Sequence, residues 1–508
     1  MKKLKGFWKC LLCAGSLATC AAISISPAYA ADEELAELKA RLERLEQQNE
    51  YLRRVIESGV RPATGVVERE QIEQIVQDLI QVQASKEVKK EPSKEEWLEV
   101  GKDLNLRARW RDGLYFDTAD GAFSVRVRGR VDNDWGWVTA DPQVTEAPGG
   151  IGTLDDGVIF RRARLGVQGT IYEVFYYTAE YDFGEGVHTR FADVFMGVNQ
   201  LPYIGSFQAG HYKEPFSLEQ LTSARFITFI ERSILDDAFV PARNTGMSIQ
   251  NAVLDERVTY AVGLFRPTND VGGVVTGAGD GEYALTARVT ALPWYEHDGR
   301  CLLHLGIAGS HRDLDDGQIR FRTRPYRMPT VRNFLDTGTV FGENEDLLGL
   351  EAALVLGPLS IQSEYMHAWV DSAVVNQVPL GEIGFDGFYI YVSYFLTGEN
   401  RVYRKPEGVF DRVRPFENFW LVRTGEEGCL GHCLGLGAWE ITARYAHLNL
   451  RDTGIDRGQL NQWTIGLTWY WNPNMKVLWN YEILDVNRPG SANDGEVQSL
   501  VMRFHLDF

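Results

Sequence analysis

Three short stretches in which arginine recurs at every second position are candidate binding surfaces. The stretches are Arg126, Arg128 and Arg130, then Arg162 and Arg164, and finally Arg320, Arg322 and Arg324. A β-strand turns alternate side chains to one face, so each stretch predicts a row of guanidinium groups that point the same way. The planar guanidinium fork binds phosphate and carboxylate oxygens in a bidentate manner. The spacing therefore predicts surfaces that attract oxyanions.

Arginine dominates over lysine in this part of the chain. After residue 100 there are 33 arginines and four lysines. Acidic side chains such as Asp132, Asp134 and Glu180 lie near the stripes in sequence and could separate the like charges. An alternative interpretation is that each arginine pairs with a carboxylate and only fills a polar interior. Lysine would serve equally well for that purpose, so the bias favours oxyanion binding.

Overall charge and length limit the class of protein. The chain has 508 residues, 44% hydrophobic and 24% charged, with a formal net charge of −18. This length allows a large core or a large barrel. The acidic balance argues against nucleic acid as a partner. A cationic surface could still line a cavity inside an acidic protein.

The first 30 residues predict a signal peptide that is removed on export. Four lysines in the first nine residues precede an apolar run, and Ala28-Tyr29-Ala30 provides a small-x-small cleavage site. A lipoprotein signal with Cys20 as the acylated residue is the alternative. No other stretch approaches 18 consecutive apolar residues, so no transmembrane helix is predicted in the mature chain.

Residues 31–57 predict a coiled coil. A 3-4-3-4 spacing relates the seam residues Leu35, Leu38, Leu42, Leu45, Asn49, Leu52 and Ile56. A solvated amphipathic helix is the alternative interpretation. Residues 58–99 are predicted to form a linker with a second short helix, whose apolar positions run from Ile72 to Val82.

From residue 100 to residue 508 the hydrophobic period changes to two. The last strand, for example, sets Met502, Phe504 and Leu506 against Arg503 and His505. Alternation fits a soluble sandwich or a membrane barrel, but strand-end tryptophans and the aromatic C-terminus favour the barrel. Roughly 400 residues at about 25 per strand and connection allow about 16 strands. We therefore expect an all-β, transmembrane antiparallel barrel preceded by an α-helical coiled coil.

Catalytic and metal-binding signals are weak. After cleavage three cysteines remain, and the pair Cys429 and Cys433 predicts a loop disulfide more than a partial metal site, while Cys301 stays unpaired. Adjacent acids such as Asp315 and Asp316 point to opposite faces of a strand or lie in turns. No nucleophile–histidine grouping, phosphate loop or zinc motif stands out. The chain is therefore not expected to be an enzyme or to hold a cofactor.

One long segment resembles a known family of outer-membrane proteins. It is Gly210–Ser223 (GHYKEPFSLEQLTS), continued by Phe229–Ser233 (FIERS) and Pro241–Asn244 (PARN). Similar stretches are Gly129-Arg130, Phe160–Ala163 with Gly166 and Gly169, Arg312–Leu314, and Leu396–Glu399. Together these resemble the phosphate-selective porin O and P family over most of the predicted barrel, but not over the coiled coil.

The resemblance implies a trimer of 16-stranded barrels in the outer membrane, with arginines that lead anions through the lumen. Position by position, it implies lumen roles for Arg130, Arg161, Arg162, Arg232, Arg322 and Arg324. Strand parity adds Arg126, Arg128 and Arg164, and Arg225 could supply charge nearby. One departure is Gln220, which stands where phosphate-selective members have a lysine. Phosphate is therefore a less secure expectation than anion passage.

Two functions from different classes follow. The first is a passive anion channel for phosphate or related oxyanions, embedded in outer-membrane lipid. The second is a structural protein that tethers the outer membrane to the cell wall through residues 31–96.

Overall fold

The computed structural model describes residues 104–146, 150–184, 188–273, 282–314, 317–328, 331–422, 433–489 and 494–508. The chain divides into two compact units, Met1–Ser93 and Lys94–Phe508, and every described residue belongs to the second. The predicted signal peptide (1–30), coiled coil (31–57) and linker with its short helix (58–99) lie outside the described residues. Among the described helices, none is long and apolar enough to cross a membrane.

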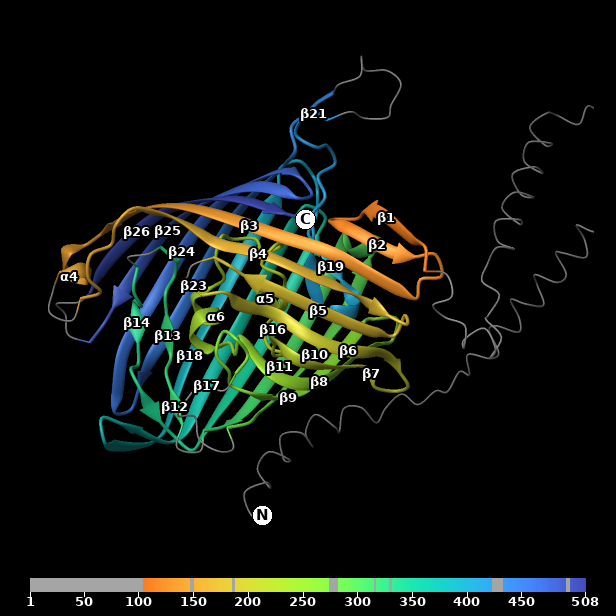
Figure 1. Ribbon diagram of the computed structural model, residues 1–508. Coiled ribbons are helices and arrows are strands. Elements are labelled where there is room, and N and C mark those ends of the chain that lie inside the picture. Colours follow the sequence, from red (N-terminus) through yellow and green to blue (C-terminus); the bar gives the residue numbers. More distant parts are fainter. Residues whose placement is uncertain are drawn as a thin grey trace, which may run out of the picture. The chain divides into compact units, whose positions relative to one another are not determined.

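Sixteen antiparallel strands form a closed ring (Figure 1). The ring closes where β26 pairs with β3, from Val497 opposite Ala140 to Asp507 opposite Arg130. This confirms the predicted all-β barrel of about 16 strands. The strands are β3 (Phe123–Ala140), β4 (Gly157–Ile171), β5 (Phe175–Asp182), β6 (Arg190–Leu201), β7 (Gly205–Lys213), β8 (Arg243–Val253), β9 (Val258–Arg266), β10 (Ala284–Glu296), β11 (Cys301–Asp313), β16 (Asn344–Leu356), β17 (Leu359–Val375), β18 (Val378–Phe395), β23 (Ala438–Asp452), β24 (Ile455–Asn472), β25 (Met475–Asn487) and β26 (Gly495–Asp507).

The barrel strands present an apolar outer face, and many of their inner-facing residues are polar. On β24, Trp463 and Ile465 are exposed, whereas the alternating Gln462 and Thr464 are fully buried. A soluble sandwich would bury the apolar set instead. Exposed apolar residues alternating with enclosed polar ones are the pattern of a strand that faces lipid outside and a polar lumen inside. The alternation in the sequence is therefore that of a membrane barrel.

A short hairpin extends the ring beside the chain end. It consists of β1 (Leu106–Trp110) and β2 (Leu114–Thr118), and β2 pairs with the first residues of β3, beyond the point where β26 ends. The ring of Phe508 lies over Gly129, where an added Cβ would come within 2.3 Å of the phenyl Cζ. The missing side chain at Gly129 thus makes room for the C-terminal aromatic residue.

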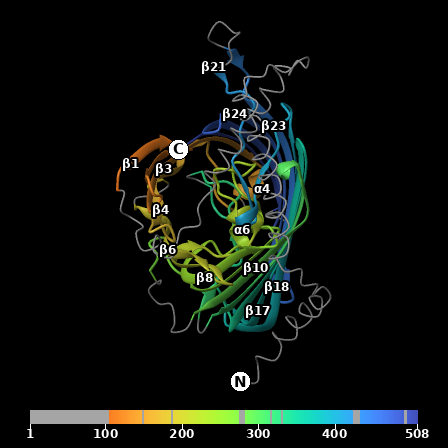
Figure 2. The ribbon, with the colours of Figure 1, turned by 90° about the vertical axis from the view of Figure 1, so that its right-hand side faces the viewer.

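The connection between β7 and β8, residues 214–242, folds into the barrel, and we call it the inward segment. It contains α5 (Leu218–Leu221) and α6 (Ile234–Phe239), and α6 lies inside the ring of strands in Figure 2. The backbone N–H groups of Leu218 and Glu219 donate to Glu364 on β17, at 3.1 and 2.8 Å. Its two neighbours in sequence are β7 and β8, so these contacts with β17 show that the segment reaches across the lumen.

Apolar side chains fill one side of the lumen. Phe229 and Leu235 of the inward segment pack with Phe321 and Phe334 from the β11–β16 connection, and with Phe385 on β18. Each of these side chains is almost completely buried. Burial of one such side chain contributes about 1.5–3 kcal/mol, so this cluster fixes the inward segment against β16–β18 and β23–β26. Open space remains along the wall from β3 to β9.

The third arginine stripe does not lie on a barrel strand, which corrects the sequence-based expectation. Arg320, Arg322 and Arg324 belong to the β11–β16 connection, where the short strands are β12 (Gln318–Ile319), β13 (Arg322–Thr323), β14 (Leu335–Asp336) and β15 (Val340–Phe341). Phe321 turns into the apolar cluster and its N–H donates to Thr337 Oγ1 at 3.0 Å. Local packing, and not the barrel ladder, therefore sets the path of this stretch.

A second hairpin enters the lumen from the β18–β23 connection, at the end of the barrel where the chain terminates. It is formed by β19 (Val402–Arg404), the 3₁₀ turn η4 (Lys405–Glu407) and β20 (Val409–Asp411). Lys405 Nζ donates to the carbonyl of Asp255 at 3.2 Å, and Arg412 Nη1 donates to Asp507 on β26 at 2.9 Å. The hairpin therefore crosses the lumen. The remaining short elements are α4 (Pro142–Thr145), η3 (His297–Gly299), β21 (Trp420–Val422) and β22 (Cys433–Gly435).

Candidate functional site

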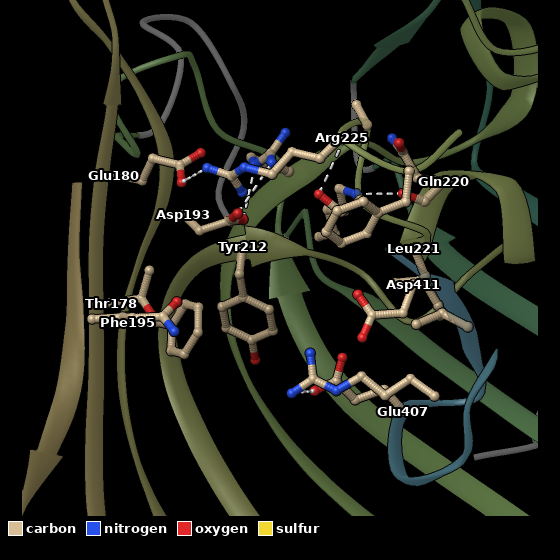
Figure 3. Close-up of a pocket in the computed structure, with 18 of the residues that line it drawn as sticks. Thr178, Glu180, Asp193, Phe195, Tyr212, Gln220, Leu221, Arg225, Glu407 and Asp411 are labelled. Carbon is tan, nitrogen blue, oxygen red and sulfur yellow. Dashed lines mark hydrogen bonds and ion pairs between the residues drawn. The ribbon is translucent and has the colours of Figure 1, made fainter. Parts of the chain in front are cut away.

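A cavity of about 1460 Å³ lies between the wall β3–β10, the inward segment and the β19–β20 hairpin. Its lining includes 17 arginines and one lysine, against eight aspartates and glutamates. This excess of cations stands inside a chain with a formal charge of −18. Figure 3 shows part of the cavity, with Glu180 on the wall and Arg225 reaching toward it from the inward segment.

The lining changes character along the barrel because strand register aligns inward residues into rows. One row aligns Arg130, Arg164, Asp182 and Arg190 on four successive strands. The next row, closer to the barrel end at which Phe508 lies, holds Arg128 and Glu180 on either side of Gly166. We call these the charged rows. Closer to the barrel end at which Phe508 lies, Arg126 on β3 still pairs with Gln168, but the positions on β4 to β8 carry uncharged side chains: Gln168, Thr178 and Phe195 in one row, and Thr170, Tyr176, Gln208 and Ser248 in the other. We call these the neutral rows.

A β-bulge brings two adjacent arginines to the lumen. On β4, Arg162 lies opposite Asp132 and Phe160 lies opposite Asn133, so Arg161 is the extra residue. A regular strand would turn Arg161 and Arg162 to opposite faces. Because of the bulge both line the cavity, while Phe160 stays exposed on the outer face.

Asp132 is the centre of a buried ion-pair cluster on the wall of the cavity. It accepts hydrogen bonds from Arg130, from Arg162 Nη1 at 3.2 Å and from His505 Nδ1 at 2.6 Å. Arg503 Nη1 lies 3.9 Å from the same carboxylate. Several guanidinium groups thus share one carboxylate, so the pairing leaves an excess of positive charge.

Glu231 extends this cluster into the inward segment. Its carboxylate accepts hydrogen bonds from Arg161 Nε and Arg503 Nη2, both at 2.8 Å, and Arg162 Nη2 lies 3.7 Å away. Burial alone would raise the pKa of Glu231, but these guanidinium groups hold it well below its usual value. Glu231 therefore remains ionised and ties the inward segment to β4 and β26.

Glu180 is shared in the same way. Arg128 Nε lies 2.8 Å from its carboxylate, Arg225 Nη2 3.1 Å and Arg164 Nη1 3.4 Å. Arg225 also approaches Asp507, at 3.6 Å. The acids thus hold the arginines at fixed positions along the wall, as the sequence suggested for Asp132, Asp134 and Glu180.

Gln220 lies on α5 and lines the cavity at the position where a lysine was expected. Its carbonyl accepts hydrogen bonds from Lys213 Nζ and from Arg232 Nη2, the latter at 3.1 Å. Lys213 is itself a lining residue at the end of β7. Two basic side chains therefore converge at the backbone carbonyl of Gln220, whose own side chain is neutral.

Nine of the ten predicted site residues line this one cavity: Arg126, Arg128, Arg130, Arg161, Arg162, Arg164, Arg225, Arg232 and Arg322. Arg324 does not line it; its backbone N–H donates to Asp237 and its Nη1 to the carbonyl of Val331. The sequence reasoning missed Lys213 and eight further lining arginines: Arg111, Arg190, Arg243, Arg288, Arg327, Arg404, Arg412 and Arg414. Arg111 alternates with Arg107 and Arg109, and Arg412 with Arg414, so their spacing was a signal that could have found them. The others stand apart in the sequence, although Lys213 and Arg243 lie in the stretches that carry the family resemblance.

The remaining chemical predictions concern cysteines and metals. Cys429 lies outside the described residues, so its disulfide with Cys433 stays a prediction. Cys301 carries a free thiol. Across the described part of the chain, no group of three His, Cys, Asp or Glu side chains is arranged to hold a metal ion.

We expect the charge of the lining to depend on pH through Asp236. Burial raises the pKa of Asp236 to about 7, opposed by Arg232, whose Nε lies 3.8 Å away, and reinforced by Glu219 and Asp237. The carboxylate is therefore ionised at pH 8 and largely neutral at pH 6, so the lining gains about one positive charge as the pH falls. The anion-to-cation permeability ratio in planar bilayers should rise between pH 8 and pH 6.

The variant Asp236→Asn should lose much of this pH dependence and behave at pH 8 as the parent does at pH 6. Asp270→Asn is the control, since it removes another lining carboxylate, from the β9–β10 connection. An unchanged pH profile in Asp236→Asn would contradict the assignment.

A closed 16-stranded barrel with an apolar outer face and a hollow, charged interior defines an outer-membrane channel. The family model described as phosphate-selective porin O and P matches residues 118–508, and the chain belongs to this family. It is thus an outer-membrane porin, a passive channel and not an enzyme.

Two curated relatives are similar over most of the chain. Porin O of Pseudomonas aeruginosa is 24% identical over 418 residues, covering 74% of this chain and 86% of the relative. An uncharacterized protein of Caulobacter vibrioides is 28% identical over 413 residues, covering 78% of this chain and 76% of the relative.

Solved barrels are less similar. OmpT of Vibrio cholerae in its trimer form gives a TM-score of 0.45 at 12% identity, covering 76% of this chain and 100% of that one. An anion-selective porin from Comamonas acidovorans gives a TM-score of 0.44 at 13% identity, covering 76% of this chain and 100% of that one. With TM-scores below 0.5, neither structure bears on what this chain conducts.

Proposed function

We propose that the protein is an anion-selective channel that lets phosphate or related oxyanions diffuse passively through the outer membrane. The observation that carries this proposal is the cavity lining, with 17 arginines and one lysine against eight acids. In a narrow lumen with low-dielectric walls, such an excess focuses the field and raises the local anion concentration. The predicted site residues act in this proposal as the lining that receives the anion.

Several lining arginines share one carboxylate, and this arrangement favours the passage of anions. A channel needs sites that bind strongly enough to admit an ion and weakly enough to release it. An arginine that already shares a carboxylate, as Arg128, Arg164 and Arg225 share Glu180, keeps N–H groups for a passing oxyanion while its position stays fixed. A row of such arginines passes the anion from one shallow site to the next.

Gln220 bears on which anion is preferred. It lacks the charge of the expected lysine, but Lys213 and Arg232 meet at its carbonyl. We propose that these two groups supply the missing charge, so that phosphate remains the first candidate among oxyanions. Membership of the phosphate-selective porin O and P family supports the same solute class.

Assembly as a homotrimer, export through a signal peptide and a cell-wall contact through residues 31–96 complete the proposal. The latter two concern residues outside the described part of the chain. The tethering alternative rests on the same residues.

The reversal potential in a salt gradient tests the proposal. With the intact protein in planar bilayers and a tenfold gradient of potassium chloride, we expect the sign that indicates chloride as the more permeant ion. Millimolar phosphate should then block the chloride current. A reversal potential of the opposite sign would show a cation channel and refute the proposal.

A further inference from the structure

The neutral rows add no positive charge to the cavity. They present hydroxyl, amide and aromatic groups from β4 to β8, directly beside the charged rows. A bare oxyanion binds these neutral groups less strongly than it binds guanidinium groups. Along one strand, the lining changes from charged to neutral between two neighbouring inward-facing residues. This change points to a solute with two chemically different parts.

The carboxylate of Asp411 faces the same space. Asp411 ends β20 on the hairpin that crosses the lumen, and it lines the cavity. Figure 3 shows Asp411 and Glu407 on one side of the space and Thr178, Phe195 and Tyr212 on the other. The Asp411 carboxylate accepts a hydrogen bond from the neighbouring backbone N–H of Arg412, at 2.8 Å. A carboxylate here repels a bare anion, but it accepts well from hydroxyl groups.

The hairpin places Asp411 close to the cationic lining. The N–H of Phe410 donates to Thr222 Oγ1 of the inward segment at 3.3 Å, and Arg412 shares Asp507 with Arg225. An acceptor for hydroxyls and a group of oxyanion donors therefore lie next to each other.

Aromatic side chains complete the neutral region. The ring of Phe195 packs edge-on against Tyr176, with centroids 6.0 Å apart, and against Tyr212, at 5.6 Å. Tyr212 is held by a hydrogen bond from its hydroxyl to Ser248 Oγ, at 2.8 Å. Fixed rings of this kind offer an apolar surface to the carbon skeleton of a solute, while Thr178 and Gln208 offer hydrogen bonds at its edge.

The spacing also fits a solute of two parts. Neighbouring rows are two residues apart along a strand, which corresponds to about 6.8 Å. This separation is comparable to that between the phosphate and the ring hydroxyls of a phosphorylated sugar. Glu180 in the charged row and Thr178 in the neutral row are such a pair of positions on β5.

We propose that the channel binds phosphorylated sugars or polyols, with the phosphate in the charged rows and the hydroxylated body between the neutral rows and Asp411. This inference rests on the proposed anion channel and specifies its solute. The carbon skeleton lies against Phe195 and Tyr212, and the hydroxyls donate to Asp411 and exchange hydrogen bonds with Thr178 and Gln208.

The test compares four solutes as blockers of the chloride current through the intact protein in planar bilayers. They are glucose 6-phosphate, cyclohexylmethyl phosphate (a ring of the same size without hydroxyls), inorganic phosphate and glucose. Glucose 6-phosphate should block at a concentration about tenfold lower than either of the other two phosphates, because several hydrogen bonds add to the phosphate contact. Glucose alone should not block in the same range.

Two variants separate the parts of the site. Asp411→Asn makes the lumen more positive, so it should strengthen block by inorganic phosphate while weakening block by glucose 6-phosphate about threefold to tenfold. Asp270→Asn is the matched control, since it removes a lining carboxylate from the β9–β10 connection at the opposite end. It should shift both phosphates in the same direction. Thr178→Val, which removes one hydroxyl with little change of shape, should weaken only the sugar phosphate.

Equal block by the two phosphate esters, or a parallel gain for both phosphates in Asp411→Asn, would overturn this inference and leave the anion channel standing. A cation-selective pore would overturn both proposals together.

Discussion

Replacing Arg161 and Arg162 together by glutamine is expected to lower the anion-to-cation permeability ratio about tenfold. Both side chains line the cavity, and both contact Glu231. The double variant removes two positive charges and leaves Glu231 paired only with Arg503. A unit charge about 8 Å away contributes about 2 kcal/mol at an effective dielectric constant of about 20, before screening by salt. Reversal potentials in a salt gradient measure the change.

The matched control for this experiment is the double variant with Arg320 and Arg324 replaced by glutamine. It removes the same charge from the third stripe, whose two outer arginines do not line the cavity. We expect its permeability ratio to stay within twofold of the parent. If both double variants reduced selectivity equally, the net charge of the protein, and not the lining, would control the current.

Replacing Asp132 by alanine is expected to destabilise the barrel by about 3–5 kcal/mol, because breaking a buried ion pair leaves uncompensated charge. Asp132 is fully buried, and Arg130, Arg162, Arg503 and His505 all converge on it. Arg503 retains Asp134 and Glu231, but Arg130 loses its carboxylate partner. Denaturant unfolding of the protein in lipid vesicles measures the loss.

Asp117→Ala is the control for stability. Asp117 forms an ion pair with Arg109 at 2.8 Å, but Arg109 is largely exposed, and such pairs contribute about 1 kcal/mol or less. Similar losses in the two variants would mean that the Asp132 cluster does not hold the wall together.

The barrel was predictable because its physical signal repeats along the whole chain. Polar Gln462 and Thr464 alternate with apolar Trp463 and Ile465, and lipid outside with a polar lumen inside requires just this order. Strand parity likewise placed Arg126, Arg128 and Arg130 on one face, as the structure shows. Both properties are local and periodic, so a sequence displays them.

The lining was only partly predictable because loops complete it. Arg320, Arg322 and Arg324 have the spacing of a strand. Their path is nevertheless set by Phe321, which is buried in the apolar cluster on one side of the lumen. Arg412 reaches the lumen through a hairpin whose position depends on contacts with Asp507 on a strand 95 residues away. Such long-range contacts leave no period in the sequence. The bulge at Arg161 was equally hidden, because only the register with Asp132 and Asn133 reveals it.

That bulge has a consequence for how the channel can vary. Deleting one residue from a regular part of a strand turns all later side chains of that strand to the opposite face. In β4 such a deletion would expose the arginines to lipid. Removing Arg161 would instead restore a regular ladder, since Arg162 and Phe160 already lie opposite consecutive residues of β3. At this point the chain can therefore gain or lose one lumen charge by a single-codon insertion or deletion, with the rest of the barrel unchanged.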